Sequence, residues 1–265
     1  MNGTTGDAAI ISAEGLGLAF GSVRALEDVN FTVKQGEVFA VIGPNGAGKS
    51  SLFNVLTSVY QPTSGAVSVL GADMSRTRPD KIASLGIVRS FQNLGLFPEM
   101  SVLENVLIGG HHRTTSGIFR SLARSPQCRR EEGVERDRAL ATLANLAISD
   151  LADRPVGQLP YGVQKRVELA RCLNADPKVL LLDEPVAGMS SEDRVEITTL
   201  IEDLRANPDL TLLIVEHDVG MVMRVADTVM VLDFGGVVAC GAPEQIRTDP
   251  AVISAYLGSP KEDVA

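Results

Sequence analysis

The run at residues 43–50, GPNGAGKS, constrains the fold of this chain more than any other stretch. The apolar residues of 38–42 precede it without alternation, as expected for a strand covered on both faces. Apolar residues then recur at helical spacing, at Leu52, Phe53, Val55, Leu56 and Val59. The turn residues QPTSG at 61–65 predict the end of that helix. A buried strand, a glycine-rich turn and a helix therefore open an α/β unit.

The order and spacing of residues in this run fit a phosphate site, because the run matches G-x-x-x-x-G-K-[ST] without a gap. Its glycines let successive N–H groups point inward as an anion cradle, and the following helix adds its positive end. Lys49 is placed to reach the β- and γ-phosphates of a nucleotide, and the Ser50 hydroxyl to help hold Mg²⁺. The predicted nucleotide contacts are Gly43, Pro44, Asn45, Gly46, Ala47, Gly48, Lys49, Ser50 and Ser51.

A second signal is an apolar strand that ends in two acids, VLLLDEP at 179–185. Asp183 lies where it can bind the Mg²⁺ shell, directly or through water. Glu184 comes next and can orient and polarise the water that attacks the γ-phosphate. One Asp-Glu pair after a strand is also common in ordinary loops. The phosphate loop alone leaves kinases, GTPases and many ATPases open, and the acidic pair beside it favours Mg²⁺-dependent attack of water on a γ-phosphate.

The bulk properties exclude several other classes of protein. Net charge is −9 and no long block of Lys or Arg occurs, which argues against a nucleic-acid surface. The three cysteines, Cys128, Cys172 and Cys240, have spacings that fit no metal site and favour free thiols. The first residues lack the pattern of a signal peptide. No stretch approaches the roughly 18 apolar residues that span a bilayer, so we expect any membrane contact to go through a partner.

The rest of the chain alternates predicted strands and helices, which indicates an α/β fold with a mainly parallel sheet. Strands are predicted over 10–20, 26–43 and 210–215, and a hairpin over 229–241. Residues 93–156 differ in composition, being charged and, in their later half, strongly helical. Two short helices are predicted near the C-terminus, with Pro243 and Pro250 close to their starts.

A third signal, QLPYGVQKRVELARCL at 158–173, lies just before the acidic strand. With it the chain resembles the ATP-binding-cassette (ABC) ATPases, over about residues 10–258. The resemblance implies an α/β P-loop NTPase (RecA-like) core with an antiparallel β subdomain and an inserted α-helical subdomain. We expect a single nucleotide-binding domain over 1–265. Its core and β subdomain would occupy 10–92 and 157–258, the helical subdomain 93–156, and flexible ends 1–9 and 259–265.

The same resemblance assigns roles to further residues. Phe20 occupies the place of an aromatic that stacks on adenine. Gln92 matches the glutamine that contacts Mg²⁺ and couples the site to the transporter, and His217 the histidine that contacts the γ-phosphate. Tyr161 and Gly162 belong to the signature, which contacts the nucleotide held by a second cassette.

Two departures from the family pattern concern the signature and the loop after Glu184. The general signature is Leu-Ser-Gly-Gly-Gln, and here Pro160 and Tyr161 replace its serine and first glycine. Pro160 has neither a hydroxyl nor an N–H to donate to a γ-phosphate, whereas Gly162 and the helix N-terminus still have donors. Ser190 stands where many ABC proteins carry an aspartate, which puts the usual contact between the two cassettes in question.

Several segments resemble one branch, the ATPase subunits of bacterial branched-chain amino acid importers. These are FQNLGLFPEMSVLENVLIGGHH at 91–112, LPYG at 159–162, DEPVAGM at 183–189 and the stretch 240–258. The resemblance implies two multi-span membrane permease subunits, a second ATPase subunit and an extracytoplasmic solute-binding protein. The second ATPase is a paralogue or a copy of this chain. The expected location is peripheral, on the cytoplasmic face of the bacterial inner membrane.

Other readings differ in substrate or in partner. Urea, short amides and other small carboxylates use similar cassettes, because the cassette never touches the transported solute. A soluble ABC ATPase of DNA repair is disfavoured, because that type carries a long coiled coil between Gln92 and the signature and this chain has a much shorter interval there. Translation types are disfavoured because they usually carry two cassettes, whereas this chain has one. A binding module without catalysis is disfavoured by the presence of every expected catalytic residue: Lys49, Ser50, Gln92, Asp183, Glu184 and His217.

Overall fold

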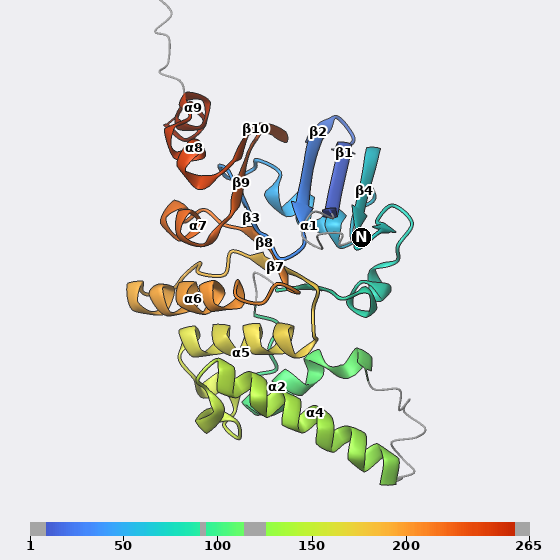
Figure 1. Ribbon diagram of the computed structural model, residues 1–265, viewed down its shortest axis with the longest axis vertical. Coiled ribbons are helices and arrows are strands. Elements are labelled where there is room, and N and C mark those ends of the chain that lie inside the picture. Colours follow the sequence, from blue (N-terminus) through green and yellow to red (C-terminus); the bar gives the residue numbers. More distant parts are fainter. Residues whose placement is uncertain (1–8, 91–93, 114–125, 258–265) are drawn as a thin grey trace, which may run out of the picture.

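The computed structural model describes residues 9–90, 94–113 and 126–257. Two sheets and a group of helices form three regions (Figure 1). The antiparallel sheet lies at one end, helices α2, α4 and α5 lie together at the other, and the larger sheet runs between them. Gln92 lies outside the described residues, so its predicted role stays a prediction.

The larger sheet has six strands in the order β10-β9-β3-β8-β7-β6. Neighbours from β9 to β6 are parallel, whereas β10 is antiparallel to β9, which is the predicted hairpin. The strands are β3 (Val38–Ile42), β6 (Ile87–Arg89), β7 (Val179–Asp183), β8 (Thr211–Val215), β9 (Thr228–Asp233) and β10 (Gly236–Gly241). The parallel register brings the carboxyl ends of β3, β7 and β8 to one edge, where α/β proteins bind ligands.

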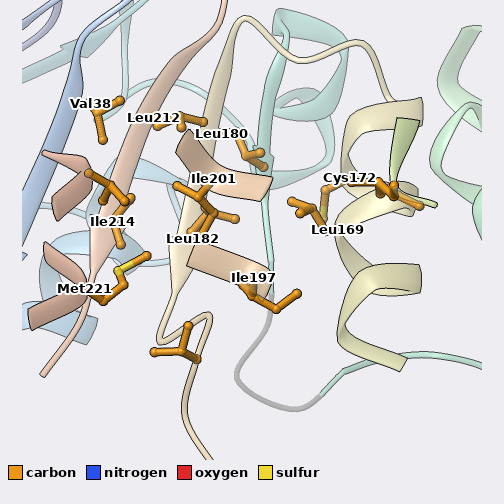
Figure 2. Packing of buried hydrophobic residues seen from close by; sticks show 14 of the residues in the cluster. Val38, Leu169, Cys172, Leu180, Leu182, Ile197, Ile201, Leu212, Ile214 and Met221 are labelled. Carbon is orange, nitrogen blue, oxygen red and sulfur yellow. The ribbon is translucent and has the colours of Figure 1, made fainter. Parts of the chain in front are cut away.

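The central strands are apolar throughout because both faces of this sheet are covered, as the sequence predicted. On β3, Val38, Ala40 and Ile42 join one buried cluster, and Phe39 and Val41 join the other. Figure 2 shows the first cluster, in which Leu182 and Ile214 pack near Ile197 and Ile201 of α6. This packing fixes the strand ends that carry the acidic residues.

The smaller sheet is antiparallel, in the order β2-β1-β4-β5, and it forms the predicted β subdomain. Its strands are β1 (Ala9–Phe20), β2 (Val23–Lys34), β4 (Ser64–Val69) and β5 (Ala72–Asp73). β2 alternates buried and exposed residues, since one face packs on the core and the other faces solvent. The rings of Phe31 and Phe39, whose centroids lie 5.5 Å apart, join the two sheets.

The helices cover both faces of the larger sheet and form the region at its far end. They are α1 (Lys49–Leu56), α2 (Val102–Gly109), α4 (Pro126–Asn145), α5 (Tyr161–Asn174), α6 (Ser191–Leu204), α7 (Val219–Val225), α8 (Pro243–Thr248) and α9 (Pro250–Leu257). Single 3₁₀ turns are η1 (Pro79–Lys81), η2 (Ala83–Leu85), η3 (His111–Arg113), η4 (Ser149–Leu151) and η5 (Val156–Gln158). α8 and α9 each begin at a proline, as predicted.

The helical region contains α2 and α4 of the segment predicted to be a separate subdomain, 93–156. The helix α5, which lies after that segment, also contacts both α2 and α4. Ser101 caps α2 in a capping box, with its hydroxyl accepting from the Glu104 N–H while the Glu104 carboxylate accepts from the Ser101 N–H. The boundary at residue 156 stays a prediction. No helix among the described residues is long and apolar enough to cross a bilayer.

The helix after the phosphate loop is shorter than its periodicity predicted. α1 ends at Leu56, Ser58 has a φ of 56°, and Val59 is 54% exposed. The Thr57 hydroxyl donates to the Phe53 carbonyl, and the N–H of Val59 turns back to Asn54. These local hydrogen bonds replace the next helical turn, and such competition by side chains is invisible to hydrophobic spacing.

Candidate functional site

The loop between β3 and α1 requires its first and last glycines. Gly43 has a φ of 153°, and a Cβ there would lie 2.1 Å from the Leu232 carbonyl oxygen. Gly48 has a φ of 103°, in the left-handed region, and a Cβ there would lie 2.5 Å from the Ala25 carbonyl oxygen. No side chain fits at either position, so the loop packs this tightly only because both residues are glycine.

The end of this loop is a helix N-terminus with free backbone donors. α1 begins at Lys49, and the Leu52 N–H donates to the Gly48 carbonyl at 2.9 Å. A helix leaves the N–H groups of its first turn without helical partners, so those of Lys49, Ser50 and Ser51 are available to an anion. Ser50 is exposed at this first turn. The loop therefore ends in backbone donors that could bind a phosphate, and the phosphate contacts predicted for 43–51 stay a prediction.

Lys49 is the cation of this loop, and it is largely buried. Its Nζ donates to the carbonyl oxygens of Gly43 at 2.6 Å and Pro44 at 2.9 Å. Burial lowers the pKa of the Lys49 ammonium, because removal from water disfavours the charged form. Three nearby carboxylates oppose that shift: Glu184, Asp183 and Glu216. The lysine therefore lies in the field of the acidic strand ends as well as in the loop.

Asp183 closes β7 and is held from two sides. Its backbone N–H donates to the Ser90 hydroxyl at 3.0 Å. Its Oδ2 accepts a 2.7 Å hydrogen bond from Arg89 Nη2, and the side chains are only 8% and 15% exposed. Arg89 also donates to Asn54 of α1 at 2.7 Å, and its guanidinium lies 5.4 Å from the centroid of the Phe53 ring. One arginine thus links β6, β7 and α1 beside the phosphate loop.

Glu184 adopts a backbone conformation that is costly for a residue with a side chain. Its φ is 49°, and its N–H donates to the Val215 carbonyl at 2.8 Å. A non-glycine residue held in the left-handed region costs of order 1–3 kcal/mol, and such residues concentrate at functional sites. His217 follows the neighbouring strand, and its Nδ1 lies 4.0 Å from Glu184 Oε1. The structure therefore brings together the predicted base and the predicted γ-phosphate histidine.

Glu216 is a residue of this site that sequence reasoning missed. It follows β8 directly, and none of its surface is exposed. Its Oε1 accepts the Val186 N–H at 3.1 Å. Its Oε2 accepts the N–H groups of His217 at 2.8 Å and Asp218 at 3.0 Å. The carboxylate thus joins the loop after β7 to the loop after β8.

The signature residues lie against the loop after β7 and the first turn of α6. Gly162 is buried, and a Cβ there would lie 2.3 Å from Asp193 Oδ1. The Tyr161 hydroxyl donates weakly to the Ala187 carbonyl at 3.5 Å, and Tyr161 is 42% exposed. No hydrogen bond among the described residues joins either residue to the loop 43–50.

Ser190, where the family pattern predicted an aspartate, has a structural role in this chain. Its hydroxyl accepts the Asp193 N–H at 3.1 Å as the N-cap of α6. The same hydroxyl lies 2.8 Å from Asp193 Oδ2. Pro160 is the N-cap of α5, one residue before the helix begins at Tyr161. Both departures from the family pattern are therefore compatible with well-formed helix starts.

Phe20, the predicted adenine contact, lies at the end of β1 and is 49% exposed. Its ring meets the ring of Tyr60 edge to face, with centroids 5.1 Å apart and an interplanar angle of 76°. Aromatic pairs favour this arrangement, which leaves part of the Phe20 ring accessible to a ligand. Tyr60 was not predicted, because it follows α1 and pairs with Phe20 only through the fold.

Comparison with known proteins shows the family to which this chain belongs. Residues 26–187 match the family model for the ABC transporter, and residues 237–262 match that for the branched-chain amino acid ATP-binding cassette transporter. The chain is 40% identical to the high-affinity branched-chain amino acid transport ATP-binding protein LivG of Escherichia coli. That match covers 94% of this chain and 98% of LivG. BraF of Pseudomonas aeruginosa, which has the same description, matches with the same identity and the same coverage.

Two solved structures extend the comparison to the fold. The ADP conformation of MJ1267, an ATP-binding cassette of an ABC transporter, superposes with a TM-score of 0.81 at 32% identity, covering 95% of this chain and 100% of that one. A dimeric post-hydrolysis state of the cassette MJ0796, bound to ADP and Pi, gives a TM-score of 0.72 at 25% identity, covering 88% and 98%. The chain belongs to the ABC transporter ATP-binding proteins, within the branched-chain amino acid type represented by LivG and BraF.

Proposed function

We propose that this chain hydrolyses ATP to power an ABC importer for branched-chain amino acids. The observation that carries the proposal is the meeting of four predicted residues at one edge of the larger sheet: Lys49, Asp183, Glu184 and His217. The substrate class rests on the likeness to LivG and BraF, including the C-terminal match at 237–262. Urea, short amides or other small solutes are the second candidate class, because the cassette itself does not contact the solute.

The phosphate loop binds the nucleotide and limits its motion. The N–H groups at the start of α1 face the β-phosphate region, and Lys49 supplies the nearby positive charge. On nucleotide binding, Nζ exchanges its contacts with the carbonyls of Gly43 and Pro44 for contacts with phosphate oxygens. Phosphoryl transfer depends mainly on such positioning and charge stabilisation. Phe20 stacks on the adenine ring.

Glu184 acts on the attacking water, and His217 contacts the γ-phosphate. A carboxylate within hydrogen-bond reach of the water can accept its proton as the bond to phosphorus forms. His217 Nδ1 and Glu184 Oε1 are 4.0 Å apart, which is too long for a direct hydrogen bond. The two side chains are close enough to act on one target, the γ-phosphate and its attacking water.

The residues present fit Mg²⁺. This ion favours oxygen ligands, keeps several waters, and uses only one or two protein groups plus phosphate oxygens. Asp183 offers a carboxylate at the end of β7 and Ser50 a hydroxyl at the start of α1. Among the described residues no group of three His, Cys, Asp or Glu side chains could form a metal cage, which agrees with this type of site. When bound, the ion would neutralise phosphate charge; Gln92 is its third proposed contact.

Two cassettes share each nucleotide in the proposed mechanism. The signature residues Tyr161 and Gly162 lie against 187–193 of their own chain and are proposed to contact ATP on the second ATPase subunit. ATP then favours the closed pair, and hydrolysis releases it. The dimeric structure of MJ0796 with ADP and Pi supports pairing of such cassettes. The second subunit is a paralogue or another copy of this chain.

A groove between the larger sheet and the helical region is the proposed site for a membrane permease subunit. Its cavity volume is about 500 Å³. Apolar side chains dominate its lining: Val59, Ile82, Ile87, Ile108 and Cys172. Two multi-span permeases would hold the ATPase pair peripherally at the cytoplasmic face of the membrane. An extracytoplasmic solute-binding protein would act on the permeases and reach this chain only indirectly.

Reconstitution tests the proposed function as a whole. The chain is assembled with candidate permeases, a second ATPase and a solute-binding protein in proteoliposomes, with ATP on the cassette side. We expect ATP-dependent uptake of radiolabelled leucine, isoleucine or valine that is lost with Lys49→Ala. Lys178→Ala is the matched control, because it removes an exposed lysine just before β7, at the opposite end of that strand from Asp183 and outside the groove lining. Uptake of urea or acetamide but not of leucine would move the proposal to the second substrate class.

A further inference from the structure

Glu216 lies at the point where three parallel strands end. Its backbone N–H donates to the Val41 carbonyl at the end of β3, at 3.3 Å. Its neighbour Val215 pairs with Asp183 in register and accepts the Glu184 N–H at 2.8 Å. The side chain of Glu216 is therefore enclosed between the two loops that carry Glu184 and His217.

Within the described part of the chain, the Glu216 carboxylate accepts its hydrogen bonds from backbone N–H groups. Oε1 accepts the N–H of Val186, two residues after Glu184, and Oε2 accepts the N–H groups of His217 and Asp218. The Nδ1 atom of the His217 ring is also near, 3.6 Å from Oε2. A carboxylate is the side chain that offers acceptors at both ends and no donor. Charge-assisted bonds to backbone N–H groups are also stronger than neutral ones.

We propose that Glu216 is a positioning residue for ATP hydrolysis, whose carboxylate holds the Glu184 loop and the His217 loop in one fixed arrangement. The proposal rests on the roles proposed above for Glu184 and His217. Glu184 needs such support because its own backbone is strained at a φ of 49°. His217 needs it because its side chain is 57% exposed and has few packing contacts to hold its loop.

The chemistry separates this role from simple packing. Glu216→Gln keeps the size and shape of the side chain but replaces one oxygen with an NH₂ group. That group is a donor and would face the N–H of Val186 or those of His217 and Asp218. Glutamine can therefore hold one loop and must release the other. If the residue only filled space, glutamine would serve as well as glutamate.

The proposal predicts a split between catalysis and nucleotide binding. Loss of an outer partner that orients a metal ligand typically costs about 10- to 100-fold in activity, and we expect a comparable cost for a residue that orients a catalytic loop. We expect kcat of Glu216→Gln to fall by that factor. ATP affinity should not weaken beyond about threefold, because Lys49 and the phosphate loop remain and a negative charge near the phosphates is removed.

The matched control is Asp227→Asn. Asp227 Oδ2 accepts the Val38 N–H at 2.9 Å, so it also supports β3, but at the start of that strand and away from the site. The kcat of the Asp227→Asn variant should stay near that of the unchanged protein, even if the melting temperature of the variant falls. The measurements are steady-state ATPase of the assembled transporter and fluorescence titration of the full chain with a fluorescent ATP analogue.

Hydrogen–deuterium exchange gives a second readout that does not depend on turnover. In Glu216→Gln, exchange should rise in peptides that cover 184–190 or 216–220 and stay unchanged over 38–42. A shorter variant, Glu216→Asp, keeps acceptors only but cannot span both loops. It should give an intermediate kcat, and it carries the test if the glutamine variant folds poorly.

The outcomes distinguish this proposal from the proposed function. Unchanged kcat in folded Glu216→Gln or Glu216→Asp, with Glu184→Gln inactive, would overturn the role of Glu216 alone. Unchanged kcat in Glu184→Gln would overturn the proposed base and this inference with it. Equal losses of kcat and of ATP affinity would make Glu216 a structural residue of the whole site and would also contradict the proposal.

Discussion

Arg89 Nη2 donates a 2.7 Å hydrogen bond to Asp183 Oδ2, and this buried ion pair joins the end of β6 to the end of β7. Arg89 also lines the groove proposed for the permease. One side chain therefore contacts the acidic strand end and also lines the proposed docking groove. Because Gln92 follows three residues later, β6 leads directly from this pair into the segment proposed to couple the site to the transporter.

Removing Arg89 should destabilise the fold. Loss of one partner of a buried ion pair leaves an uncompensated charge and costs about 3–5 kcal/mol. We expect Arg89→Gln to lower the free energy of unfolding by roughly that amount in urea titrations. Arg78→Gln is the control, because Arg78 pairs with Asp80 at the surface, where an ion pair contributes about 0–1 kcal/mol. Equal, small effects of both variants would show that the Arg89–Asp183 pair does not stabilise the fold.

Removing Lys49 should weaken nucleotide binding. Lys49→Ala deletes the cation beside the phosphates, and hydrogen bonds to charged groups contribute about 1.5–3 kcal/mol, or roughly 10- to 150-fold in affinity. Fluorescence titration with an ATP analogue measures the change, with Lys81→Ala as the exposed control. Unchanged affinity in Lys49→Ala would count heavily against the phosphate-loop assignment.

A charge placed in the groove should block assembly and leave nucleotide binding intact. Ile108 is 38% exposed and lines the groove, so Ile108→Glu puts an unpaired carboxylate into the proposed apolar contact. Val134→Glu on α4 is the control, because Val134 is 54% exposed but does not line the groove. Co-purification with the permeases should fail only for Ile108→Glu. If both variants assembled and transported normally, the groove would not be the docking site.

The segment 97–104 of the helical region lies outside the groove lining and gives a separate test of permease docking. Phe97 is 51% exposed, so Phe97→Glu should also reduce assembly. Reversal of the charge at Glu104 is a less clear test, because Glu104 belongs to the capping box of α2 and its loss would also weaken the helix. If assembly and transport survived both Phe97→Glu and other charge changes across 97–104, this segment would not belong to the proposed interface.

Local sequence patterns predicted the elements that carry the site. The phosphate loop and the strand ending in Asp183 and Glu184 are each contiguous, so spacing and residue type describe them fully. The hairpin of β9 and β10 and the two proline-started helices were predicted for the same reason. The short strands β4, β5 and β6 were not, because six residues or fewer with few apolar positions give little periodicity.

Contacts between distant residues could not be read from the sequence. Arg89 and Asp183 lie 94 residues apart, and Glu216 and Val186 lie 30 apart. Only the parallel register of β6, β7 and β8 brings these groups together. A weak signal for both Arg89 and Glu216 is a charged residue directly after a predominantly apolar strand segment. The roles of Gln92, Phe20 and the signature residues rest on the family resemblance and stay predictions.

The central claim is that Glu184 is the base for ATP hydrolysis, and Glu184→Gln tests it most directly. The variant keeps the shape but cannot accept a proton, while Lys49, Ser50 and Asp183 remain to bind the nucleotide. Steady-state ATPase of the assembled transporter should fall by roughly 10²–10⁴-fold. ATP should still bind, and size-exclusion chromatography with ATP should show the closed ATPase pair accumulating. Near-normal turnover in a folded, ATP-binding variant would contradict the account.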